Sequence, residues 1–121
     1  IFTDNNRYVE DKLMAQTHLE EIAFSIIAAA GDGRAKVTEA LKAAREGSFG
    51  QARGALKDAD AQFLKAHQLQ TAELLKKEAA GELKDPFNVL VAHAQDYVMT
   101  GMAMKEMAEE IVNLYEKVAA K

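Results

Sequence analysis

The sequence predicts an all-α protein, folded as an up-down-up bundle of three helices. Proline, which breaks helices because it lacks an amide proton and clashes with the preceding turn, occurs once in 121 residues. The helix formers Ala, Leu, Glu, Lys and Met are abundant, and β-branched residues seldom form runs. Glycine and proline signals divide the chain into three segments of roughly 30 to 40 residues. Short connections between such segments make neighbouring helices antiparallel.

The first helix is expected to begin near Asp4 or Asn5, because both residue types cap the free amides of a helix start. Gly31 and Gly33 follow a long apolar stretch, and glycine weakens a helix through its backbone freedom. We therefore expect a break in this helix near Gly31–Gly33. Helical periodicity then resumes and ends at Gly47, a residue type that readily adopts the left-handed backbone that closes a helix.

The second helix is expected to begin at Ser48, which forms the pattern of a capping box with Gln51 three residues later. Apolar side chains then recur at steps of three and four residues from Phe49 to Ala66. This spacing predicts an amphipathic helix with one buried face. Gly81 is the expected end of the second helix.

The third helix is expected to begin at Asp85 and Pro86 and to run to about Val118. Aspartate caps free amides, and proline at the first helical position sacrifices no hydrogen bond. The range 87–104 contains one formal charge, Asp96, and its apolar side chains do not keep to one stripe. Two surfaces of this helix therefore need burial, and one small bundle covers only one of them.

The second apolar surface has two possible roles, in a membrane span or in self-association. A membrane span suits the length of the stretch, but polar and ionisable side chains such as His93 and Asp96 make insertion costly. Self-association buries the same surface without that cost. The pattern therefore predicts an oligomer.

Composition limits the function. The formal net charge is −4, and the basic residues are scattered among acidic ones, so a nucleic-acid partner is not expected. The chain has no cysteine, which excludes disulfides and thiolate metal sites. No signal-peptide pattern opens the sequence, so we expect a cytoplasmic location. The length suits a single domain over residues 1–121.

His93, Asp96 and Thr100 lie at spacings that place them on one face of the third helix, among apolar neighbours. Spacing alone leaves two interpretations open. His93 is either a hydrogen-bonded histidine of the core, with Asp96 as a buried ion-pair partner, or a reactive imidazole. A second polar line on the second helix contains His67, Gln70 and Thr71.

Several chemistries are excluded by spacing. The residues three positions before His18, His67 and His93 are apolar, whereas a di-iron bundle needs carboxylates there. No glycine-rich phosphate loop, His-Glu-x-x-His motif or cysteine nucleophile is present, so no nucleotide is expected. His18 is interpreted as a surface residue. A neutral imidazole near pH 7 remains, and it suits a reversible phosphoryl relay.

The segment from Val89 to Thr100 reads V-L-V-A-H-A-Q-D-Y-V-M-T. It resembles the signature His-Ala/Gly-Gln-Asp-His-Leu-Met of the lactose/cellobiose family of enzyme IIA components of bacterial sugar phosphotransferase systems. Tyr97 replaces the second histidine of that signature, and Val98 replaces the leucine. Further similarity extends over nearly the whole chain, in the segments 30–34, 43–49, 66–71 and 78–81.

The resemblance implies a cytoplasmic homotrimer of three-helix subunits. In this family the first signature histidine, here His93, accepts a phosphoryl group from the histidine-containing phosphocarrier protein. It passes the group to a cysteine of the IIB component for uptake of a β-disaccharide. The membrane is reached only indirectly, through the sugar permease. The alternative function is a non-catalytic trimeric scaffold, and the replacement at Tyr97 is the one sequence feature that favours it.

The resemblance also implies supporting residues and a metal ion. It places the signature aspartate, here Asp96, near the threefold axis, where three copies share a divalent cation. Oxygen ligands favour a hard ion, so we expect Mg²⁺ rather than zinc. Further residues expected to line or support the cleft are His67, Gln70, Thr71, Gln95 and Tyr97.

Overall fold

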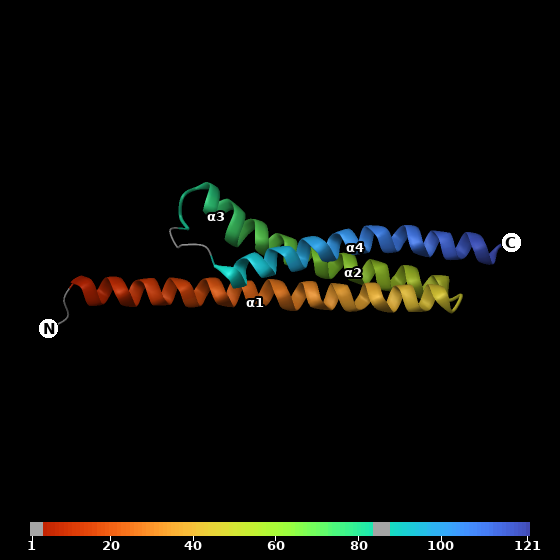
Figure 1. Cartoon of the computed structure of the whole chain (residues 1–121), viewed down its shortest axis with the longest axis horizontal. Helices are drawn as coiled ribbons and strands as arrows, with labels where there is room; N and C mark the ends of the chain where they lie inside the picture. The colour runs from red at the N-terminus through yellow and green to blue at the C-terminus, as the bar shows by residue number, and fades with distance from the viewer. Residues whose placement is uncertain (1–3, 84–87) are drawn as a thin grey trace.

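The computed structural model describes residues 4–83 and 88–121, which form one elongated helical bundle (Figure 1). Its elements are α1 (Asp4–Arg45), α2 (Phe49–Leu69), the π-helical segment η1 (Gln70–Leu75), α3 (Lys76–Ala79) and α4 (Val89–Ala119). α2, η1 and α3 follow one another without a turn and form one arm. α1 and α4 run in the same direction and the α2 arm runs oppositely, so the predicted up-down-up three-helix bundle is confirmed.

The predicted break near Gly31–Gly33 is wrong. α1 is one uninterrupted helix of 42 residues that passes through both glycines. A Cβ atom at Gly33 would lie 2.8 Å from a ring carbon of Phe63, so glycine here lets α2 approach α1 closely. Two glycines weaken a helix by about 1 kcal/mol each, and the packing of a long apolar face outweighs that cost.

The two predicted glycine ends are confirmed. Gly47 has φ +83° and donates its amide to Ala44, while Ser48 donates to Ala43, which is the hydrogen-bond pattern of a Schellman motif. Gly81 has φ +72° and closes α3 with the same pair of hydrogen bonds. Both positions need the left-handed backbone that glycine adopts without strain.

The predicted capping box at Ser48 is wrong. Ser48 does precede α2, but its side chain accepts no hydrogen bond from the helix start. The amide of Ser48 is bound to α1, and its backbone angles, φ −91° and ψ 69°, do not turn the hydroxyl toward the first turn of α2. The end of α1 therefore decides the conformation of this residue.

The start of α4 is fixed by Asn88, whose Oδ1 accepts a hydrogen bond of 3.2 Å from the amide of Val91. This is a standard side-chain cap. The predicted start signal at Asp85 and Pro86 lies outside the described residues. The end of α4 at Ala119 agrees with the predicted end near Val118.

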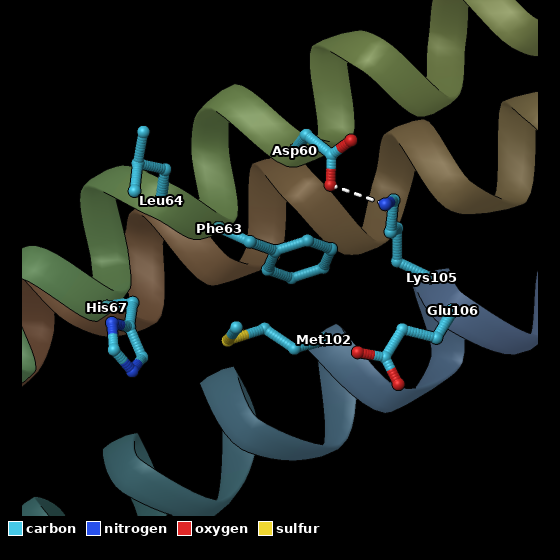
Figure 2. A pocket seen from close by; sticks show the side chains of 7 residues that line it. All are labelled: Asp60, Phe63, Leu64, His67, Met102, Lys105 and Glu106. Atoms are coloured by element: carbon cyan, nitrogen blue, oxygen red, sulfur yellow. Dashed lines mark ion pairs between the residues drawn. The ribbon is translucent and has the colours of Figure 1, made fainter.

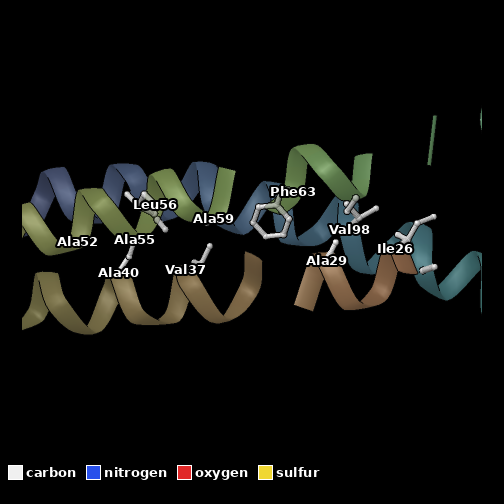
Figure 3. Packing of buried hydrophobic residues seen from close by; sticks show 14 of the residues in the cluster. Ile26, Ala29, Val37, Ala40, Ala52, Ala55, Leu56, Ala59, Phe63 and Val98 are labelled. Atoms are coloured by element: carbon white, nitrogen blue, oxygen red, sulfur yellow. The ribbon is translucent and has the colours of Figure 1, made fainter. Parts of the chain in front are cut away.

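The core is built from small and medium apolar side chains on facing helices (Figure 3). Alanines predominate, and the largest ring in it belongs to Phe63, which is 3% exposed. A Cβ atom at Gly101 of α4 would lie 2.6 Å from the same ring, as one at Gly33 of α1 would lie 2.8 Å away. Phe63 therefore occupies a slot between two glycines on two different helices, which we call the glycine slot.

α4 has two apolar faces, of which one is buried in the bundle and the other is exposed. Its buried face consists of Ala94, Val98, Gly101, Ala108 and Val112. The other face carries exposed apolar side chains, which we call the outer stripe: Val89, Met104, Met107, Ile111, Leu114 and Val118. Steps of three and four residues connect them through His93, Asp96 and Thr100. No helix in the described ranges meets the length and hydropathy that a bilayer crossing requires.

Candidate functional site

His93 lies in the second turn of α4, and its side chain is exposed in the chain. Its ring stacks on that of Tyr97 one turn later, with ring centroids 5.8 Å apart and planes inclined by 22°. The interpretation of His93 as a histidine of the core is therefore wrong. The imidazole stands at the surface with an aromatic ring beside it, where a second protein can reach it.

Tyr97 is held against α1 by Arg34. The guanidinium carbon of Arg34 lies 4.5 Å from the centre of the Tyr97 ring, which is a cation–π contact. The same guanidinium donates a 3.2 Å hydrogen bond to the backbone carbonyl of Tyr97 and a 3.1 Å bond to Oγ1 of Thr100. A Cβ atom at Gly31 would lie 3.6 Å from the Tyr97 hydroxyl, so this end of the ring is seated over a glycine.

The sequence pattern gave no indication that Arg34 belongs to the site. It stands 63 residues before Tyr97, and its neighbours Gly31 and Gly33 were interpreted as a helix break. Only the pairing of α1 with α4 brings the guanidinium to the signature segment. Gln95, the other supporting residue of the signature, is half-buried on α4.

Asp96 is exposed in the chain, on the outer stripe of α4. Its backbone carbonyl accepts a 2.6 Å hydrogen bond from the hydroxyl of Thr100, which also receives the bond from Arg34. Within residues 4–83 and 88–121, no three His, Asp or Glu side chains of one chain are grouped to hold a metal ion. One copy of the chain therefore offers a single carboxylate at this position.

The second predicted polar line is divided by the fold. His67 is half-buried and lines a groove of about 310 Å³ between α2 and α4 (Figure 2). Gln70 points into the interior instead and is 4% exposed, and its Oε1 has no hydrogen-bond partner among the residues that the structure describes. Thr71 is half-buried within η1. The change to π-helical hydrogen bonding from Gln70 onward alters the register of these residues, and nothing in the local sequence indicated it.

Lys105, which lines the groove, is paired with carboxylates on two helices. Nζ of Lys105 lies 2.7 Å from a carboxylate oxygen of Asp60 on α2 (Figure 2) and 2.5 Å from a carboxylate oxygen of Glu109 on α4. Burial lowers the pKa of Lys105, but hydrogen bonds and charge attraction to the two carboxylates together outweigh burial and leave that pKa raised above 10.5. Lys105 therefore ties α2 to α4, and its charge is already compensated.

Comparison with known proteins identifies the family and agrees with the fold. Residues 21–116 match the family model described as the lactose/cellobiose-specific IIA subunit of the phosphotransferase system. The chain is 46% identical over 100 residues to the lichenan-specific phosphotransferase enzyme IIA component of Bacillus subtilis, covering 83% of this chain and 89% of that protein. The matched range includes His67 and His93 but not His18.

Solved structures also resemble the bundle. The cellobiose-specific enzyme IIA of Bacillus anthracis superposes with a TM-score of 0.80 and 40% identity, over 85% of this chain and 93% of that one. The chitobiose IIA of Escherichia coli, solved in complex with HPr, superposes with a TM-score of 0.72 and 30% identity, over 84% of this chain and 96% of that one. The chain thus belongs to the lactose/cellobiose-specific IIA family of the phosphotransferase system.

Proposed function

We propose that the protein is a phosphocarrier that receives a phosphoryl group on His93 from the histidine-containing phosphocarrier protein, HPr. It then passes the group to a cysteine of a IIB component, in the cytoplasm, for uptake of a β-disaccharide through a membrane permease. The observation that carries the proposal is the exposed imidazole of His93 in the signature segment of α4. The chitobiose IIA relative, solved in complex with HPr, supports the choice of donor.

The other histidines suit the role less well. His18 lies outside the residues that match the family, on the exposed first part of α1. His67 is half-buried in a groove whose lysine is already paired with carboxylates. A relay between two proteins needs an imidazole that both partners can approach, and His93 offers it.

The chemistry needs no nucleotide. A ring nitrogen of His93 attacks the phosphorus of the donor's phosphohistidine, so a new N–P bond forms while the donor's N–P bond breaks. In the second step the thiolate of the IIB cysteine attacks the same phosphorus, an S–P bond forms, and His93 leaves with its electron pair. Imidazole is suited to both steps because it is nucleophilic near neutral pH and is also a good leaving group.

We further propose that the active form is a homotrimer joined through α4. The outer stripe leaves large apolar side chains uncovered, among them Met107 at 67% and Leu114 at 61% exposure. Its steps of three and four residues suit packing against the same stripe of other copies. Since His93 lies on this stripe, trimer formation would place the imidazole at a cleft between subunits.

A shared divalent cation, Mg²⁺ by ligand preference, is proposed for Asp96. A single Asp96 is not a metal site, but three copies brought together by the outer stripe would converge. Three carboxylates that converge on one point repel one another and cannot all stay ionised without a cation. The donor set, carboxylate oxygens alone, suits a hard ion. Its contribution would be to hold the trimer together, and the two transfer steps use only protein groups.

Phosphorylation by purified components tests the central proposal. The protein is incubated with phosphoenolpyruvate, enzyme I and HPr, and an acid-labile phosphoryl group is sought by intact-protein mass spectrometry. We expect one group per chain, lost in His93→Gln and kept in the matched controls His67→Gln and His18→Gln. Normal labelling of His93→Gln together with loss in His67→Gln would refute the site. Absence of labelling in the unaltered protein would favour the non-catalytic scaffold.

A further inference from the structure

The environment of His93 contains a chain of contacts that runs from α1 to the imidazole. Arg34 on α1 lies over the ring of Tyr97, and the ring of Tyr97 stacks with that of His93. The distances are 4.5 Å from the guanidinium carbon to the ring centre and 5.8 Å between the two ring centres. Three side chains from two helices thus form a continuous row of contacts, with Tyr97 in the middle.

Tyr97 is restrained from several directions. Its ring contacts the guanidinium of Arg34, its own carbonyl accepts a hydrogen bond from that group, and its hydroxyl end is seated over Gly31. The remaining hydrogen bond of Arg34, to Thr100 one turn further, fixes the guanidinium itself. Because the cation stays bound to α4 at two points, the ring below it has little freedom to change rotamer.

The His93 ring stacks on the Tyr97 ring, but His93 itself is exposed at the surface. An exposed side chain normally exchanges among rotamers, and a histidine at the surface of a helix would present its ring nitrogens in several directions. Side chains on a helix lean toward its N-terminus, so the Tyr97 ring lies against the residue four positions earlier. A ring that is itself immobile therefore restricts the orientation of the imidazole.

We propose that Tyr97 is a positioning residue for His93 and that Arg34, from the neighbouring helix α1, positions Tyr97. This inference rests on the proposed function of His93. Phosphoryl transfer between two proteins requires the attacking nitrogen, the phosphorus and the leaving nitrogen to be in line, and catalysis of this kind depends almost entirely on positioning. The flat ring at Tyr97 supplies the plane against which the imidazole is held, and the hydroxyl is not needed for it.

The test separates ring stacking from general stability by comparing Tyr97→Phe, Tyr97→Leu and Arg34→Met. The imidazole proton shifts of His93 are measured by NMR, because a stacked aromatic ring displaces them. Single-turnover transfer from phosphorylated HPr is measured across donor concentrations. Tyr97→Phe is expected to keep the shifts and a rate within about twofold of the unaltered protein. Tyr97→Leu is expected to lose the displacement and slow transfer roughly 10-fold at saturating donor, without changing the half-saturating donor concentration.

Arg34→Met should reproduce the effect of Tyr97→Leu in weaker form, about threefold in rate, because the ring stays but is no longer held. Arg53→Met is the matched control. Arg53 also reaches α4 from another helix, bonding Asn113 at 3.1 Å and pairing with Glu116, but it lies far along α4 from His93. It should leave both readouts unchanged. Circular dichroism checks that each variant is folded. If Tyr97→Leu does not fold, the Arg34→Met results decide between the outcomes.

Unchanged His93 shifts in Tyr97→Leu would overturn the inference, and so would a lost displacement with an unchanged transfer rate. Equal slowing by Tyr97→Phe and Tyr97→Leu would assign the effect to the hydroxyl and overturn the ring's role. If the unaltered protein carries no phosphoryl group on His93, the proposed function fails separately. The NMR comparison then still decides whether Tyr97 orients the imidazole.

Discussion

The glycine slot around Phe63 allows the packing of this bundle to be tested at single atoms. Gly33 of α1 and Gly101 of α4 both face the Phe63 ring, where an added Cβ would lie 2.8 Å and 2.6 Å from its nearest carbon. Real Cβ contacts are not this short, so Gly33→Ala and Gly101→Ala each force the ring or a helix to move. Gly54 of α2 is the matched control, because no atom of the described residues outside its own stretch of helix lies within 4 Å of a Cβ added there.

The expected magnitudes follow from two opposing effects. Replacing glycine by alanine inside a helix stabilises it by about 1 kcal/mol. Forcing a methyl group into a packed core costs typically about 1–3 kcal/mol. Gly33→Ala should therefore lower the free energy of unfolding by about 1 kcal/mol net. Gly101→Ala should lower it by about 2, because the contact is shorter and Cγ of Arg34 also lies 3.2 Å away. Gly54→Ala should raise it by up to about 1 kcal/mol.

Urea unfolding followed by circular dichroism measures these differences. All variants are compared at one protein concentration, because the stability of a protein that self-associates depends on its concentration. The midpoint should fall for Gly33→Ala and Gly101→Ala and rise for Gly54→Ala, at an unchanged m-value. In a Phe63→Leu background the penalty of Gly101→Ala should shrink, because the shorter side chain leaves room. If all three alanine variants are stabilised alike, Gly33 and Gly101 do not form a slot and the account of the core is wrong.

Three further predictions concern assembly, metal and pH. Met107→Glu puts a charge on the outer stripe and should convert the proposed trimer into folded monomers, which light scattering measures as a lower mass. An unchanged trimeric mass would exclude this interface. Asp96→Asn should lose bound divalent metal in elemental analysis of the purified protein, and full retention would exclude the aspartate as its ligand. Lys105→Met should lower stability by roughly 1 kcal/mol at pH 7. Because the folded-state pKa of Lys105 is raised, the stability that its charge contributes is complete below pH 10.5 and is lost as pH rises through the raised pKa. Urea unfolding at still higher pH should therefore show a smaller stability difference between the unaltered protein and Lys105→Met. An undiminished difference would contradict this prediction.

Much of the secondary structure could be predicted because its causes are local. The helix-forming composition and the single proline indicate an all-α chain, and Gly47 and Gly81 end their helices through their own backbone freedom. The two apolar faces of the third helix were also visible as a pattern. His93 could be chosen from its signature segment, since the residues that carry the resemblance are adjacent in sequence.

The tertiary structure decided what depends on residues far apart in the chain. The role of Gly33 is set by Phe63 on another helix, so a glycine that weakens a helix in isolation serves here as a contact point. Burial of Gln70 and the π-helical segment that begins there likewise have no local signal. The hold of Arg34 on Tyr97 joins residues 63 positions apart. Local sequence determines which backbone conformations have low free energy, whereas contacts between helices determine which side chains meet. The surroundings of His93 depend on these contacts between helices.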